Sequence, residues 1–314
     1  MFYYPEPKLT IKKSKVFISK ISKKNQLSLK RKLANNMSSF FETSFLNGMR
    51  QFKDKISIEE VARELLKKNP STKAINEALG WEKLDFNLAP MKDSYTKTIA
   101  RAAANTQKNL VPKVIKPNLI FDINNPRVSK YISSEIGKRI TNLSRETKGS
   151  VMDIVRGAVF DINQYGIPHR KAAKNLIGDI GLNQPQANAL LNYREKLKAA
   201  NIPLQDYEKM VGKYRDKLLR DRAEMVARTE AMDAANTGEI EVWNQAADQG
   251  LVDPDKSTKT WEAGGGSCEI CQAMDGVTVP INDPFILPDG DSVYAPPAHP
   301  NCSCTITTNI EVKE

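Results

Sequence analysis

The sequence contains little histidine and little cysteine, and the cysteines are unevenly placed. Two histidines and four cysteines occur in 314 residues, and all four cysteines follow residue 260. No run approaches the roughly 18 consecutive apolar residues that a membrane-spanning helix needs. The first residues also lack the charged and apolar regions of a secretory signal. These absences predict an intracellular product that has no contact with a membrane.

Acidic residues are missing from one end of the chain and basic residues are rare at the other. Residues 8–32 contain ten basic side chains and no acidic one, whereas residues 230–314 contain fifteen acidic side chains and three lysines. A basic run can bind DNA or RNA through counterion release without reading any base. A solvated surface is the alternative interpretation. The candidate nucleic-acid contacts are Lys12, Lys13, Lys15, Lys20, Lys23, Lys24, Lys30, Arg31 and Lys32.

Residues 1–55 are expected to form a basic N-terminal arm, because Pro5 and Pro7 oppose an early helix and the apolar residues show no firm period. Order in this arm is expected to depend on a partner. Residues 56–128 are expected to hold short helices and a proline-rich connector. A helix is predicted at 72–79, where Gly80 provides a natural C-terminal cap.

Residues 129–250 are expected to form a helical body with long helices. Pro185, directly after Asn183-Gln184, predicts a helix start. Beyond Pro203, apolar residues keep a spacing of three and four as far as Met232, which predicts one long helix or two collinear ones. The fold class is therefore mainly α, with a smaller β contribution (α+β).

The composition changes after Gly250 to glycine, proline, aspartate, threonine and valine. No further helix is expected there. Short runs at 277–279 and 305–307 predict strands in a small, loop-rich module spanning 251–314. Such a module has too few apolar residues to fold unaided, so it is expected to need a covalent or metal staple.

The cysteines supply that staple. Cys268 and Cys271 form a Cys-x2-Cys turn, and His299-x2-Cys302-x-Cys304 follows about 27 residues later, a spacing that suits one tetrahedral zinc ion. Five side chains compete for four positions. Cys268, Cys271 and Cys302 are the first candidates, and the choice between His299 and Cys304 stays open.

Two disulfides or four reduced thiols are the alternatives to a zinc site. The clustering of the cysteines and the rarity of disulfides inside cells favour zinc. A shell of four protein ligands leaves no position for a catalytic water, so the zinc is expected to be structural. Loss of the metal should then unfold residues from about 260 onward.

Other singled-out residues favour structural roles. His169 is expected at a helix start or on the surface. The charged stretch Arg228-Thr229-Glu230 is expected to form an internal salt bridge or cap, not an active site. Trp243 and Trp261 are expected to anchor the long helix and the C-terminal module to one another.

An ordered set of motifs resembles the phage head morphogenesis family, also called phage Mu protein F-like minor head proteins. The resemblance covers approximately residues 130–308. A serine, Ser303, stands where family members usually carry an arginine. The matching residues comprise Arg228, Thr229, Glu230, Asn236, Gly238, Trp261 and the cysteine–histidine cluster.

The resemblance implies a low-copy structural protein of the virion head, near the portal vertex, present in the host cytoplasm during assembly. Portal protein and capsid subunits are the implied partners, with packaged DNA or its ejection as a further role. The resemblance implies neither an enzyme nor a small-molecule substrate. The alternative is a zinc-dependent nuclease or deaminase, but the His-x-Glu signature of a deaminase is missing because Arg170-Lys171 follows His169.

Overall fold

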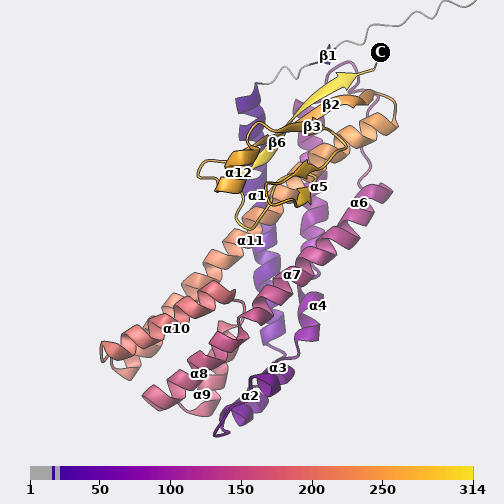
Figure 1. The fold of residues 1–314 in the computed structure, drawn as a ribbon. Helices are drawn as coiled ribbons and strands as arrows, with labels where there is room; N and C mark the ends of the chain where they lie inside the picture. Colours follow the sequence, from indigo (N-terminus) through magenta and orange to yellow (C-terminus); the bar gives the residue numbers. More distant parts are fainter. Residues whose placement is uncertain (1–15, 18–21, 314) are drawn as a thin grey trace, which may run out of the picture. The chain divides into compact units, whose positions relative to one another are not determined.

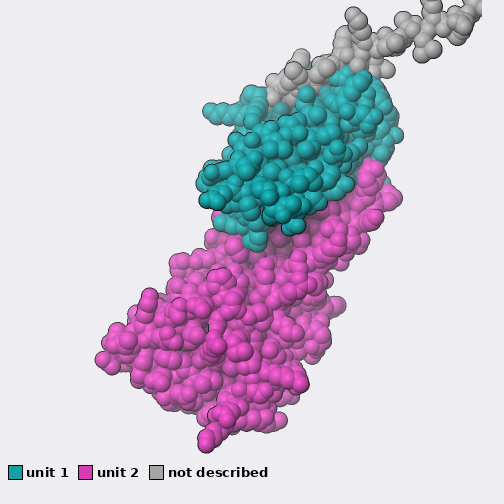
Figure 2. Space-filling view, viewed as in Figure 1, with its two compact units in different colours: residues 1–34, 98–123, 232–314 teal, residues 35–97, 124–231 magenta. Residues whose placement is uncertain are grey.

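The computed structural model describes residues 16–17 and 22–313. Its element order is drawn in Figure 1. The chain divides into two compact units, coloured in Figure 2. Unit 1 contains Met1–Ala34, Thr98–Ile123 and Met232–Glu314, and unit 2 contains Asn35–Lys97 and Asn124–Ala231. Among the described residues, no helix combines the length and apolar character needed to cross a membrane.

Three helices contribute residues to both units: α1 (Lys23–Lys53), α5 (Met91–Asn109) and α11 (Leu204–Asp248). The helix α11 is continuous over 45 residues, which resolves the choice between one long helix and two. The remaining helical elements of unit 2 are α2 (Ile58–Leu65), α3 (Thr72–Leu79), η1 (Trp81–Lys83), α4 (Leu84–Leu88), α6 (Pro126–Lys130), the π-helix η2 (Tyr131–Glu135), α7 (Ile136–Gly149), α8 (Val151–Tyr165), α9 (His169–Asp179) and α10 (Gln184–Ala199).

Local caps set several of these boundaries as the sequence predicted. Gly80 ends α3 in the left-handed conformation with φ 61°, which glycine adopts without steric cost. Asn183 begins α10 with a capping box, in which its side chain accepts from the Gln186 amide and the Gln186 side chain accepts from the Asn183 amide. His169 is the first residue of α9 and is partly exposed, as expected.

The helix α1 differs from the expected arm. From Lys23 onward the chain is helical, and one face is buried through apolar residues three or four positions apart. Tertiary packing of this face stabilises the helix despite its basic residues. Residues 1–15 and 18–21 of the expected arm lie outside the described residues. The buried residues on this face are Ala34, Met37, Phe41, Phe45, Met49 and Phe52.

The expected proline-rich connector also contains core. Helix α5 buries Tyr95 and Ile99, and Tyr95 packs edge to face on Phe41 with ring centroids 4.9 Å apart. Leu84 and Leu88 of α4 are fully buried. Pro90 directly precedes α5 and Pro126 is the first residue of α6, so the segment contains core helices as well as the expected connecting turns.

Unit 1 contains an antiparallel four-stranded sheet in the order β1-β6-β2-β3. Its strands are β1 (Val16–Phe17), β2 (Val252–Glu262), β3 (Thr278–Pro280) and β6 (Thr305–Val312), and a separate hairpin pairs β4 (Phe285–Ile286) with β5 (Ser292–Val293). The two predicted β runs fall in β3 and β6. The expectation of no helix after Gly250 is wrong, because α12 spans Glu269–Met274.

Two apolar clusters join the sheet to helices in unit 1. Trp243 of α11 packs with Val252, Ile310 and Val312 in one cluster. Trp261 of β2 packs with Ile240 of α11, Phe285 and three of the cysteines in the other. The two tryptophans thus connect α11 with the C-terminal strands, as the sequence predicted.

Candidate metal centre

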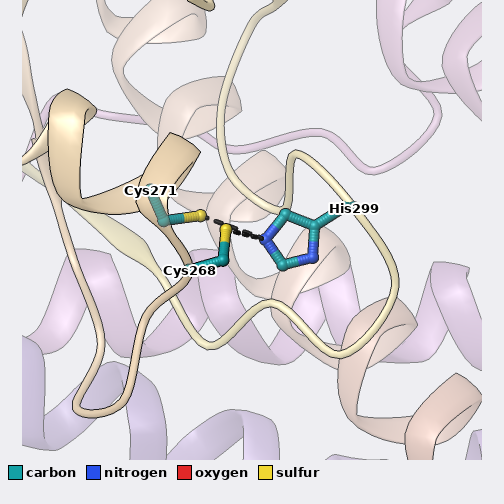
Figure 3. A group of neighbouring side chains, drawn as sticks. All are labelled: Cys268, Cys271 and His299. Carbon is teal, nitrogen blue, oxygen red and sulfur yellow. Dashed lines mark hydrogen bonds between the residues drawn. The ribbon is translucent and has the colours of Figure 1, made fainter.

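The Cys-x2-Cys motif lies at the beginning of α12. Cys268 is the N-cap residue, and its carbonyl accepts from the Gln272 amide at 2.9 Å. Cys271 follows within the first turn and is buried, whereas Cys268 is exposed. This turn directs both sulfur atoms toward the His299 ring (Figure 3). A six-residue helix is enough to place two ligands side by side.

His299 completes a group with these two cysteines. Its Nε2 atom lies 3.1 Å from Sγ of Cys268 and 3.2 Å from Sγ of Cys271. The other ring nitrogen, Nδ1, lies 2.9 Å from the Pro300 carbonyl oxygen, which can only accept. A proton on Nδ1 leaves Nε2 unprotonated, and this is the tautomer that a metal ion requires.

A tight turn after His299 brings in the remaining cysteines. The Cys302 amide donates to the His299 carbonyl at 3.2 Å, and Asn301 between them has φ 62°, a conformation that asparagine tolerates. Sγ of Cys302 lies 3.6 Å from Sγ of Cys271. Cys304, directly before β6, is also buried. All five predicted ligands therefore gather in unit 1.

These ligands form two overlapping groups that share Cys271. The metal-binding atoms of Cys268, Cys271 and His299 lie within 4.8 Å of one another, and so do those of Cys271, Cys302 and Cys304. In a tetrahedral site with Zn–S bonds of about 2.3 Å, ligand atoms stand roughly 3.5–3.8 Å apart. Each group of three is compact enough to hold one metal ion, and Cys271 belongs to both groups.

The sulfur atoms alter one another's acidity. Burial raises the pKa of the Cys271 thiol to about 12. Hydrogen bonding with Cys304 raises the pKa of Cys302, and the same contact lowers the pKa of Cys304 to about 5. Several thiolates cannot be buried together without a compensating positive charge. The donor set is thus suited to a thiophilic cation.

The motif residues Asn236 and Gly238 position this module on α11. The buried Asn236 side chain donates to the Pro296 carbonyl at 2.9 Å and accepts from Thr305 Oγ1 at 2.6 Å. It therefore holds both the chain leading to His299 and the strand following Cys304. A Cβ atom on Gly238 would lie 2.7 Å from the Ile99 carbonyl oxygen of α5, so glycine permits this close approach.

The other half of the predicted motif lies in unit 2. Glu230 is buried, forms a salt bridge with Arg139 at 3.2 Å and accepts a hydrogen bond from the Tyr95 hydroxyl. Thr229 donates to the Met225 carbonyl at 2.8 Å, and Arg228 is exposed. The expected internal salt bridge is confirmed for Glu230.

The predicted nucleic-acid contacts have diverse environments. Lys12, Lys13, Lys15 and Lys20 lie outside the described residues, and Lys24 and Lys32 are exposed. Lys23 pairs with Glu262 at 2.7 Å, and Arg31 donates to the Ala263 carbonyl at 3.4 Å. The predicted nucleic-acid contact at Lys30 is wrong. Its side chain is buried, pairs with Glu239 at 2.7 Å and donates to the Ile306 carbonyl, so it is not available to a polyanion.

The Lys30–Glu239 pair is a structural feature that sequence reasoning missed. Glu239 also accepts from Thr308 Oγ1 at 2.9 Å, so the pair links α1, α11 and β6 within unit 1. Lys30 precedes the buried Ala34 by one helical turn, which places it on the buried face of α1. The helical spacing from Lys30 to Ala34 could have indicated that Lys30 is buried, but Lys30 lies within a run of basic residues that favoured a solvent-exposed interpretation.

The segment that contains this centre matches a known protein family. Residues 194–307 match the family described as Phage Mu protein F like protein, a segment shorter than half of the chain that encloses all five candidate ligands. No curated protein and no solved structure matched the chain. The match over residues 194–307 supports the resemblance to the phage head morphogenesis family that the sequence motifs indicated.

Proposed function

We propose that the cysteine–histidine cluster holds one zinc ion with a structural role. Sulfur and imidazole ligands at this spacing favour zinc over magnesium or calcium, which prefer oxygen. Cys271 belongs to both groups of candidate ligands and is part of every plausible shell. The five candidate ligands exceed the four positions of a tetrahedral ion, which favours a structural site over a catalytic one with a bound water. The zinc would then supply folding free energy to the module.

The fourth ligand is the open point of this proposal. Cys268, Cys271 and His299 form one compact group, so either Cys302 or Cys304 completes a tetrahedral shell. Replacing each cysteine with serine, followed by X-ray absorption of the zinc-loaded protein, separates the two sets. A Cys304→Ser variant that retains full zinc affinity and an unchanged count of sulfur neighbours would assign Cys302.

We further propose that the chain is a minor head protein of a tailed phage, without enzymatic activity, that associates with the portal during head assembly. The observation that carries this proposal is the family match over the segment that contains the metal centre. The second support is the chemistry of the centre, where protein ligands outnumber the positions of a tetrahedral ion and leave none for a substrate.

Mass spectrometry of purified virions tests the head assignment directly. Peptides of this chain should be present at a few copies for each set of portal subunits. Co-expression with the portal protein of the same phage should yield a complex that survives purification. Absence from virions, together with hydrolysis or deamination of nucleic acid by the zinc-loaded protein, would favour the alternative of a zinc-dependent nucleic-acid enzyme.

The proposal also assigns DNA binding to the basic N-terminal segment, through its lysine side chains. Deleting residues 1–55 cannot test it, because Phe41, Phe45 and Phe52 of α1 are core residues. Replacing Lys12, Lys13, Lys15 and Lys20 with glutamine removes charge without removing a helix. DNA affinity should fall while portal association is retained. Equal DNA binding by this variant would remove the DNA role.

A further inference from the structure

The C-terminal module is depleted of positive charge to an unusual degree. Residues 260–312 contain no lysine or arginine, although the whole chain has 47 of them. Two acids of this segment are buried in unit 1. Glu262 forms an ion pair with Lys23, and Glu311 lies within the sheet on β6. Three exposed acids lie at the β4–β5 hairpin: Asp283 precedes β4, and Asp289 and Asp291 lie in the turn between the two strands.

The same hairpin exposes two large apolar side chains. Ile286 on β4 is 62% exposed and Tyr294, directly after β5, is 63% exposed. On the inner side of the hairpin, Phe285 packs edge to face on the buried Trp261, with ring centroids 5.3 Å apart. The hairpin thus packs on the core through Phe285 and exposes Ile286 and Tyr294 to solvent. Exposed apolar groups framed by charge often mark protein-binding surfaces.

A buried lysine holds this hairpin in place. Nζ of Lys259 on β2 lies 5.5 Å from the Phe285 ring centroid and 5.1 Å from that of Tyr294. The Lys259 side chain is fully buried, and its amine has no hydrogen-bond partner among the described residues. Burial lowers the pKa of this amine to about 8. The two rings and the nearby Asp283 carboxylate compensate for its charge.

The position of Tyr294 suits an interface anchor. Its ring contacts the Lys259 amine while most of its surface stays exposed, and this contact would restrict its rotamers. A rigid exposed aromatic group loses little conformational entropy on binding, and such groups often contribute most of the binding energy at an interface. Asp283, Asp289 and Asp291 around it would repel a polyanion and attract a cationic partner.

We propose that the surface formed by Ile286, Tyr294, Asp283, Asp289 and Asp291 docks a segment of a second protein that carries lysine or arginine side chains around an apolar anchor. The inference rests on the proposed function in one respect, because it takes this protein to be another component of the head. Charge complementarity excludes DNA as the occupant. The anchor packs on Ile286 and Tyr294, and the basic side chains lie over the three aspartates.

Site-specific photo-crosslinking in full-length protein tests this surface. A benzoylphenylalanine placed at position 286 or 294, in cells that assemble complete heads, should crosslink to a basic segment of another head protein, identified by peptide mass spectrometry. The control position is 86, because Phe86 in unit 2 is also highly exposed. Crosslinks to acidic or uncharged segments, to DNA or to a second copy of this chain, or a yield no higher than at position 86, would overturn the assignment.

A charge series at Asp291 gives a graded test. In the same cells, Asp291→Asn should lower the crosslink yield from position 286, and Asp291→Lys should lower it further, by about tenfold. The matched control is Glu77→Lys, at an exposed position on α3. Equal losses for both lysine variants would contradict the proposal.

The outcomes separate this inference from the proposed function. If virions contain the chain but positions 286 and 294 give no specific crosslink, the docking surface is wrong and the head assignment stands. If the chain is absent from virions but both positions crosslink to a basic segment of a different protein, the docking chemistry stands and the head assignment fails.

Discussion

The two units differ in the groups that stabilise their buried polar side chains. Unit 1 gathers cysteines and a histidine that could hold a metal ion, next to strands as short as two or three residues, and it also contains the buried Lys30–Glu239 pair. Unit 2 neutralises its buried charges internally, with Arg194 bound to Asp179 at 2.7 Å and to Asp161 at 3.3 Å. Both units thus neutralise buried charge with ion pairs, and unit 1 adds the proposed metal centre, which would contribute folding free energy that unit 2 obtains from helix packing.

The largest expected effect comes from a substitution that disrupts the metal centre. Cys271→Ser removes the sulfur that both ligand groups share, so zinc affinity should fall by orders of magnitude. The lost metal-binding free energy is on the order of 10 kcal/mol for structural zinc sites. Hydrogen exchange should rise across α12 and the β4–β5 hairpin while α8, α9 and α10 keep their protection.

Cys304→Ser and His299→Ala are the matched variants for that experiment. One of the two should retain metal if its side chain is the spare fifth group. A Cys271→Ser variant with normal protection in the C-terminal module would show that the module does not depend on metal.

The second prediction breaks the internal charge network of unit 2. Arg194→Leu leaves Asp161 and Asp179 buried without their cation, and removing one partner of a buried ion pair typically costs about 3–5 kcal/mol. The Tyr207 hydroxyl donates to Asp161 and cannot replace the lost charge. Denaturant unfolding should report the loss, and zinc content should be unchanged.

A compensated variant supplies the control for that prediction. Adding Asp161→Asn and Asp179→Asn to Arg194→Leu removes the unpaired charges and should recover part of the stability. Equal stability of the single and triple variants would mean that the network contributes packing alone.

The third prediction concerns the contact of α11 with α5 in unit 1. Gly238→Ala adds a Cβ atom that meets the Ile99 carbonyl at 2.7 Å and the Ala102 Cβ at 2.6 Å. Overpacking of this kind usually costs about 1–3 kcal/mol. Thermal unfolding measures the loss, and Gly212→Ala on the same helix serves as a control because its nearest contact is 3.9 Å away.

The smallest expected effect is the loss of a helix cap in unit 2. Asn183→Ala removes the side-chain acceptor of the α10 capping box and should cost about 1 kcal/mol. Asn183→Ser keeps an acceptor and should lose less. Hydrogen exchange at the Gln186 amide gives a local measurement, and identical exchange in the wild type and Asn183→Ala would show that the cap contributes nothing.

Local chemistry explains why much of the helical region and the candidate site was predictable. Gly80, Asn183 and Pro185 mark helix ends through their own conformational preferences, independent of distant residues. The spacing of Cys268, Cys271, His299, Cys302 and Cys304 likewise predicted a cluster that the structure brings together. Both kinds of signal lie within short stretches of sequence.

Long-range packing explains what the sequence did not show. Lys30 looked like a nucleic-acid contact because its buried partner, Glu239, lies more than 200 residues away. The buried face of α1 depends on helices that follow much later in the chain. The same holds for Lys259, whose aromatic partners come from β4 and the end of β5. Such pairings appear only when the chain is folded.

Metal analysis of the purified full-length protein tests the central claim most directly. Inductively coupled plasma mass spectrometry should find one zinc ion per chain in the wild type and almost none in Cys271→Ser. A wild-type protein that is folded and carries no zinc, or a Cys271→Ser variant that retains a full equivalent, would contradict the account.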